Sequence, residues 1–151
     1  MGMHADRNSD VIFEDVHVPK KNLLGKVGDG ADILRRTLIY NRVGGGMISV
    51  GIARGAFVYA LGYWRERVVG GKPLVKHSLI ASMFADMATK IDAARLLVYR
   101  SAWANMNRHP DRVRFSDMAK VFATNMAMEV TTNSPISVMP QHALNCNALA
   151  G

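Results

Sequence analysis

The stretch SLIASMFADMATKIDAARLLVYRSAWANM, residues 78–106, decides the fold of this chain. Its apolar residues recur in steps of three or four, at Ile80, Phe84, Met87, Ile91, Ala94, Val98 and Ala102. Such spacing places all of them on one face of an α-helix. A long amphipathic helix has to bury that face, so the sequence predicts that neighbouring segments pack against it.

The two flanking segments carry the same helical period. Between residues 29 and 69 one apolar stripe continues until Gly70-Gly71-Lys72-Pro73, where paired glycines and a proline favour a turn. This stripe comprises Ile33, Leu34, Leu38, Met47, Val50, Phe57, Leu61, Trp64 and Val68. A third stripe follows the break at residues 108–111, has Asp111 or Ser116 as candidate caps and fades near Thr131. It comprises Phe115, Met118, Phe122, Met126 and Val130.

Long helices that are joined by short turns must lie antiparallel. The sequence therefore predicts an all-α fold, an up-and-down helical bundle of three long helices. Stable bundles usually have four helices, so we expect the open face of three to be covered by another chain in a homo-oligomer, either a dimer or a tetramer.

The first 25 residues differ in character from the rest. Residues 11–18 are dense in β-branched and aromatic side chains, and Pro19 follows them. This pattern predicts a short N-terminal strand stub, but no later segment supplies a matching strand. We therefore expect the chain to be a piece of a larger protein.

Composition and charge narrow the classes of function. The 151 residues carry a net charge of +7, yet no Lys/Arg run is longer than two, which favours a solvated surface over nucleic-acid binding. The single cysteine, Cys146, excludes an internal disulfide and a multi-cysteine metal site. There is no secretory segment and no continuous 18-residue apolar run. We expect a cytoplasmic protein with no metal, no membrane span and no nucleic-acid partner.

Glycines interrupt the first predicted helix at Gly44-Gly45-Gly46, Gly51 and Gly55. Each costs about 1 kcal/mol of helix stability relative to alanine. Such positions indicate that something approaches the helix closely. A neighbouring helix is the favoured partner, and a bound ligand is the alternative.

Several segments, in order and spacing, resemble a known family. They are Phe13-Glu14-Asp15-Val16-x-Val18-Pro19, Gly51-Ile52-Ala53-x-Gly55-Ala56, Tyr63-x-x-Glu66-Arg67, Gly71-Lys72-Pro73-Leu74, Ala85-Asp86-Met87, Ala93-Ala94-Arg95-Leu96-Leu97 and Met118-Ala119-Lys120-x-Phe122-Ala123. Together they are similar to the flavin-dependent acyl-CoA dehydrogenases. The resemblance implies that residues 1–25 end a middle β-domain and that residues 26–132 form part of the C-terminal helical bundle domain. It also implies that residues 133–151 are a divergent or disordered tail.

The resemblance implies a cofactor, FAD, and a substrate, an acyl-CoA thioester. Arg67 matches the arginine that contacts the FAD pyrophosphate of a neighbouring subunit, and a guanidinium fork suits phosphate oxygens. Ser78 stands where the family usually has a glutamine at the flavin nucleotide, and Gly70 stands where it has an aromatic residue. The tail lacks the glutamine and paired glycines that contact FAD in the family.

On the substrate side, Arg42 matches the arginine that meets the CoA portion. Asn41 occupies the place of the catalytic glutamate in one branch of the family, and an amide cannot remove an α-proton. We therefore expect no catalytic residue in this chain. The resemblance implies a partial acyl-CoA dehydrogenase that is inactive alone. The alternative is a non-catalytic helical oligomerisation module derived from that family.

Overall fold

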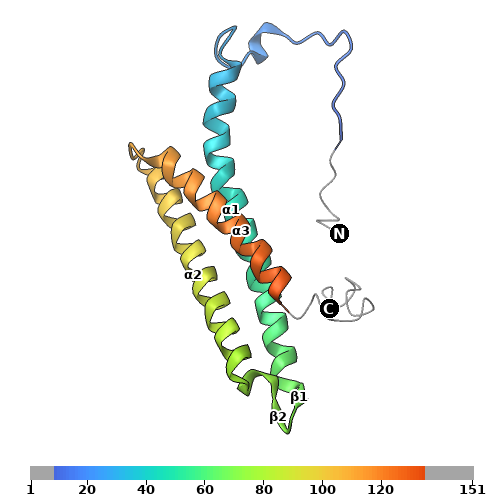
Figure 1. Ribbon diagram of the computed structural model, residues 1–151. Coiled ribbons are helices and arrows are strands. Elements are labelled where there is room, and N and C mark those ends of the chain that lie inside the picture. The colour runs from blue at the N-terminus through green and yellow to red at the C-terminus, as the bar shows by residue number, and fades with distance from the viewer. Residues whose placement is uncertain (1–8, 135–151) are drawn as a thin grey trace.

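The computed structural model describes residues 9–134, and these form three long antiparallel helices. Helix α1 spans Gly30–Glu66, α2 spans Ser78–Met106 and α3 spans Arg112–Asn133. Figure 1 shows the chain running down α1, up α2 and down α3. The prediction of an all-α, up-and-down bundle of three long helices is confirmed.

A tight hairpin joins α1 to α2. Strands β1 (Val68–Val69) and β2 (Lys72–Pro73) pair antiparallel, and Gly70 and Gly71 have φ angles of 58° and 78°. Backbone with positive φ at both central positions favours glycine, which explains the paired glycines there. A short 3-10 helix, Leu74–Lys76, then leads into α2. The predicted turn at Gly70-Gly71-Lys72-Pro73 therefore takes the form of a two-residue hairpin loop.

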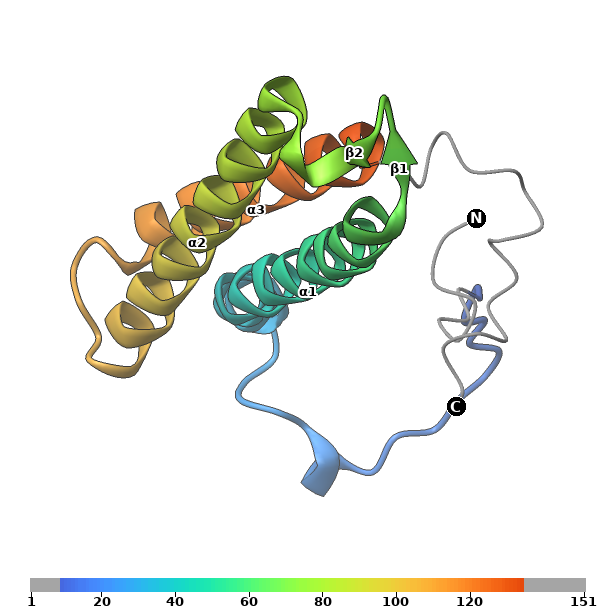
Figure 2. The ribbon, with the colours of Figure 1, turned by 90° about the horizontal axis from the view of Figure 1, so that it is seen from below.

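The prediction of an N-terminal strand stub is wrong for the described residues 9–29. This segment contains one 3-10 helix, Lys20–Asn22, and no strand. Val11, Ile12 and Phe13 are all largely exposed. Figures 1 and 2 show the segment running away from the helices without lying along any of them. A strand needs a neighbour for its backbone hydrogen bonds, and the described part of the chain offers none.

The core lies where the three helices face one another. Trp64 and Phe57 of α1 both meet Phe84 of α2 edge to face, with ring centroids 4.3 Å and 5.1 Å away. The residues that the sequence predicts for the inner face of α2 are buried from Phe84 to Val98, and Ile80 and Ala102 are half-buried. The α2 stripe is therefore confirmed as the centre of the core.

The inner face of α3 differs from the prediction. Met118 and Phe122 are 47% and 38% exposed, whereas Ala119 and Ala123 are fully buried. Small side chains let α1 and α3 approach closely, because the backbone of one helix then fits against the other. Bulky Met118 and Phe122 consequently lie outside this contact and stay partly exposed, and only Met126 and Val130 of the predicted apolar stripe are buried.

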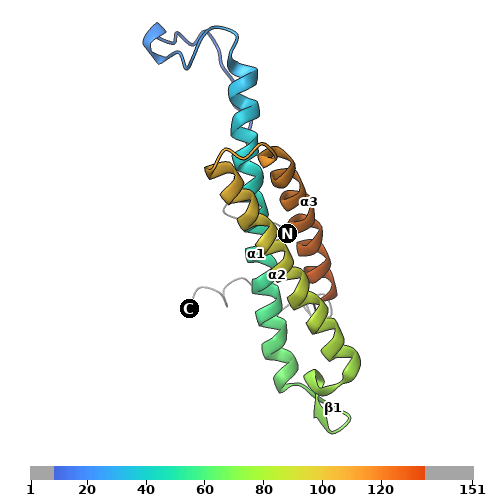
Figure 3. The same cartoon turned by 90° about the vertical axis from the view of Figure 1, so that its left-hand side faces the viewer.

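The start of α1 also departs from the predicted stripe. Leu34 and Leu38 are exposed, and Met47 is 37% exposed. Figure 3 shows that the first turns of α1 project beyond the ends of α2 and α3. No helix in the described part of the chain therefore covers Leu34 and Leu38.

Helix α1 is long and apolar enough to cross a membrane by length and composition alone. Its most apolar 18-residue window has a mean hydropathy of 1.3. One such helix is weak support for a span, because core helices of globular proteins meet the same criterion. The expectation of no membrane span is not overturned by this helix.

A small polar cluster is buried between α2 and α3. The hydroxyls of Ser101 and Ser116 lie 2.9 Å apart, and the amide Nδ2 of Asn105 donates to Ser116 Oγ at 2.9 Å. The same amide donates to the Ser101 carbonyl at 2.8 Å. The bonds from Ser101 and Asn105 to Ser116 link α2 to α3 near their connecting turn, while Asn105 Oδ1 has no hydrogen-bond partner within the described chain.

We predict that Phe84→Ala destabilises the fold by about 3–5 kcal/mol, because it removes the ring that Phe57 and Trp64 contact and leaves a cavity. Urea denaturation at one fixed protein concentration measures the loss. Met128→Ala is the matched control, since Met128 is 68% exposed and its truncation leaves no cavity. Equal effects of the two substitutions would contradict this assignment of the core.

Candidate functional site

Arg67 stands at the end of α1 with its side chain exposed. Its N–H donates to the Tyr63 carbonyl at 2.9 Å, and its own carbonyl accepts from the Leu74 N–H at 2.8 Å. The backbone of Arg67 is therefore held from both sides. The guanidinium group forms no ion pair with any residue in the part of the chain that the structure describes. It remains available to an anion.

Ser78 is the first residue of α2, and its side chain is exposed. His77, at the N-cap position, directs its ring Nε2 to the Val69 carbonyl at 3.0 Å and makes no capping bond to the helix. The first N–H groups of α2 therefore lack a capping side chain. Exposed N–H groups at a helix N-terminus favour an anion.

The hairpin places Arg67 and Ser78 at the same end of the bundle. The bond from His77 to Val69 ties the start of α2 to β1, and the bond from Leu74 to Arg67 ties the segment after β2 to the end of α1. This end combines a free guanidinium with an uncapped helix N-terminus, which are two features that suit a phosphate group. We refer to Arg67 and Ser78 as the hairpin-end site.

Arg42 and Asn41 lie in the N-terminal half of α1. Arg42 Nη1 pairs with Asp117 Oδ1 of α3 at 2.6 Å, and these side chains are 39% and 50% exposed. Asn41 is exposed one residue before Arg42. An anionic substrate group at Arg42 would have to compete with Asp117. The sequence does not indicate this partner, because the pairing depends on how α3 returns along α1.

The structure keeps the two candidate sites apart. Arg42 and Arg67 are 25 residues apart on one continuous helix, which corresponds to about 38 Å. No single small-molecule pocket spans that distance. One small ligand therefore cannot contact both the hairpin-end site and the Asn41–Arg42 region of the same subunit.

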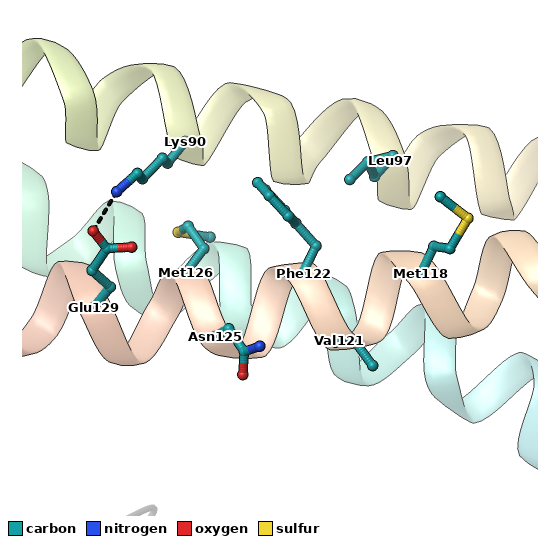
Figure 4. A pocket seen from close by; sticks show the side chains of 8 residues that line it. All are labelled: Lys90, Leu97, Met118, Val121, Phe122, Asn125, Met126 and Glu129. Carbon is teal, nitrogen blue, oxygen red and sulfur yellow. Dashed lines mark hydrogen bonds and ion pairs between the residues drawn. The ribbon is translucent and has the colours of Figure 1, made fainter.

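A groove between α2 and α3 is a feature that the sequence did not predict. It has a volume of about 400 Å³ and is mainly apolar. Figure 4 shows the ion pair between Lys90 and Glu129 at one end of it. The groove is lined by Lys90, Leu97, Met118, Val121, Phe122, Asn125, Met126 and Glu129. None of the predicted site residues lies there, so the groove is separate from both candidate sites.

The described residues offer no group of three His, Cys, Asp or Glu side chains that could hold a metal ion. The chemistry available at both sites is therefore the recognition of anions by guanidinium groups.

The bundle and its short β1–β2 hairpin define a protein of the acyl-CoA dehydrogenase C-terminal domain type. Residues 28–135 match the family model of the acyl-CoA dehydrogenase C-terminal domain. This chain belongs to the acyl-CoA dehydrogenase family.

Individual relatives agree with that assignment. The chain is 42% identical to the cyclohex-1-ene-1-carbonyl-CoA dehydrogenase of Syntrophus aciditrophicus, over 89% of this chain and 32% of the relative. It is 40% identical to a short-chain specific acyl-CoA dehydrogenase of Megasphaera elsdenii, over 89% of this chain and 35% of that protein. The solved structure of butyryl-CoA dehydrogenase from Megasphaera elsdenii superimposes with a TM-score of 0.79, at 40% identity, over 82% of this chain and 32% of that one. The chain thus spans about a third of the length of these relatives.

We predict a weak coupling between Arg42 and Asp117. Both side chains are partly exposed, so solvent screens the pair, and a double-mutant cycle of Arg42→Ala and Asp117→Ala should give about 0.2–1 kcal/mol. Urea denaturation measures it, and the coupling should fall when salt is raised. A coupling well above this range that resists salt would mean that the pair is shielded from water.

Proposed function

We propose that this chain is part of an FAD-dependent acyl-CoA dehydrogenase, an oxidoreductase that forms a double bond between the α and β carbons of an acyl-CoA thioester. The observation that carries the proposal is the match of residues 28–135 to the family's C-terminal domain, together with the free guanidinium of Arg67. Bound FAD would accept the hydride that leaves the β carbon. The chain would supply part of the flavin nucleotide site and part of the CoA site.

The residues at the hairpin end fit one portion of FAD. Arg67 and the uncapped start of α2 at Ser78 suit the pyrophosphate, because both present N–H donors to an anion. Gly70 offers no aromatic ring for stacking, and its φ of 58° follows from the hairpin geometry. The fit therefore extends to the phosphate groups and not to the ring system of the flavin.

The separation of Arg67 from Arg42 supports an oligomer. A substrate that met Arg42 and a pyrophosphate that met Arg67 would lie about 38 Å apart on α1. One active site cannot use both residues of the same subunit, and two subunits can share them. We propose that the chain acts as a homo-oligomer in which Arg67 serves the flavin of a neighbour.

No residue of this chain is proposed as the catalytic base. Asn41 is exposed on the same turn as Arg42, at the position that carries a glutamate in one branch of the family by resemblance. An amide nitrogen has no basic lone pair near neutral pH. Asn41 would instead donate and accept hydrogen bonds on the substrate side, beside the charge of Arg42.

The second candidate function is a non-catalytic oligomerisation module. The observation that favours it is the large exposed apolar surface on α1 and α3, which includes Ile48, Val58 and Met128. On either reading we propose a cytoplasmic protein without a nucleic-acid partner. Purified protein that is yellow would favour the first function, and colourless protein that self-associates would favour the second.

We predict that the chain binds FAD no tighter than millimolar. One exposed arginine to phosphate offers about 1–3 kcal/mol, whereas micromolar binding requires about 8 kcal/mol. Titration calorimetry with FAD measures the affinity, and Arg67→Ala is compared with Arg65→Ala as a control on the same exposed helix end. Micromolar binding that is lost only in Arg67→Ala would show that an oligomer builds more of the site.

We also predict that the chain does not dehydrogenate acyl-CoA thioesters. Asn41 cannot remove the α-proton, and Asn41→Glu should restore no activity because a base alone does not hold the flavin. The measurement is reduction of a dye acceptor with butyryl-CoA as substrate and FAD added. Turnover that persists after rigorous removal of host enzymes would refute this prediction.

A further inference from the structure

His77 occupies the N-cap position of α2 but does not cap the helix. Its φ of −82° and ψ of 128° give the extended backbone from which a Ser, Asp or Asn side chain usually accepts hydrogen bonds from the first N–H groups of a helix. The imidazole ring turns instead to the hairpin, where Nε2 lies 3.0 Å from the Val69 carbonyl oxygen. Because a carbonyl oxygen can only accept a hydrogen bond, Nε2 carries the proton and donates it.

His77 closes a series of hydrogen bonds that leads back to Arg67. The Arg67 carbonyl accepts from the Leu74 N–H at 2.8 Å, and the Leu74 carbonyl accepts from the His77 N–H at 3.0 Å. The bond from the His77 ring to Val69 completes the loop, because Val69 pairs with Lys72 across the hairpin. Figure 1 shows the hairpin and the start of α2 at the same end of the bundle. The position of the first turn of α2 relative to Arg67 therefore depends on His77.

The first N–H groups of α2 keep no partner within the described residues. The N–H of Ala81 is the first to reach a carbonyl of the helix, that of His77 at 2.9 Å. The N–H groups of Ser78, Leu79 and Ile80 precede it and make no hydrogen bond in the described part of the chain. Unpaired N–H groups at a helix N-terminus attract an anion. A capping side chain at position 77 would occupy some of these groups and would compete with a phosphate.

The charges at this end of the bundle also favour an anion. Residues 60–85 contain one acidic side chain, that of Glu66. The basic side chains of the same segment form no ion pair within the described chain; they are Arg65, Arg67, Lys72 and Lys76. A local excess of unpaired positive charge attracts anionic ligands.

We propose that His77 is a positioning residue of the hairpin-end site. By donating to Val69 it holds the start of α2 against the hairpin, and because it does not cap the helix, the N–H groups of Ser78 and Leu79 stay available to a phosphate. Arg67 supplies the charge, and His77 sets where that charge stands relative to the helix N-terminus. This role rests on the proposed function, since the phosphate in question belongs to the pyrophosphate of a flavin nucleotide.

Two amide substitutions separate the bond to the hairpin from the capping of the helix. The amide nitrogen of glutamine stands as far along the side chain as Nε2 of histidine, so His77→Gln should keep the bond to Val69. The shorter asparagine side chain should lose that bond and cap α2, because asparagine is a preferred N-cap residue. Both amides are uncharged, so a difference between the two variants does not arise from charge.

Inorganic pyrophosphate is the probe, and it is titrated into the full chain while heteronuclear NMR follows the N–H signals of Ser78 and Leu79. His77→Asn should bind pyrophosphate about tenfold more weakly than the wild type, because charge-assisted hydrogen bonds from the helix are lost. His77→Gln should stay within about twofold of the wild type. Urea denaturation should find His77→Asn at least as stable as the wild type, since the new cap replaces the lost bond. A role in stability alone would lower stability and affinity together.

Equal pyrophosphate affinities of His77→Asn and the wild type would overturn the inference, and so would a loss in His77→Gln as large as that in His77→Asn. A fall in both the stability and the affinity of His77→Asn would overturn it as well. Arg67→Ala separates this result from the proposed function. Wild-type affinity in Arg67→Ala would contradict the proposed flavin site, whereas weaker binding in Arg67→Ala beside unchanged binding in His77→Asn would contradict the role of His77 alone.

Discussion

The close contact between α1 and α3 is the constraint on which the rest of the structure depends. At Gly46 of α1 an added Cβ would lie 3.7 Å from the backbone oxygen of Ala119 on α3 and 3.0 Å from a methyl group of Val98 on α2. Helices approach so closely only when their facing residues are small. Ala119 and Ala123 of α3 and Ala53 of α1 meet this requirement and are fully buried.

This contact decides where the bulky side chains go. Because the narrow α1–α3 interface has no room for them, Met118 and Phe122 turn toward the groove between α2 and α3. The large aromatic residues Phe57, Trp64 and Phe84 fill the wider space near the hairpin end. The bundle is thus packed with small residues along the α1–α3 interface and with large residues near the hairpin end.

The uninterrupted length of α1 organises the functional groups. A straight helix of 37 residues carries Asn41 and Arg42 near one end and Arg67 just beyond the other. The hairpin then brings Ser78 back to the same end of the bundle as Arg67, because Gly70 and Gly71 reverse the chain within two residues. In the proposed oligomer, Arg42 and Arg67 of one subunit would serve different active sites, because the helix holds the two residues about 38 Å apart.

The sequence by itself determined the three helices, the turn between the first two and the buried face of α2. The helical period of apolar residues marks the three helices and the apolar face of α2, and paired glycines before a proline mark the turn. The motifs around Arg67 and Arg42 also pointed to the family, because they depend on residue identity and not on packing.

The tertiary structure alone decided the rest. The buried face of α3 depends on the separation of α1 and α3, and residue period does not distinguish Ala119 from neighbouring Met118 as the core position. Arg42 and Asp117 form a pair only because α3 returns along α1. Residues 11–18 have the composition of a strand, yet a strand exists only where another strand accepts its hydrogen bonds. The helical period depends only on neighbouring residues in the sequence, whereas a contact between two helices depends on how distant segments pack.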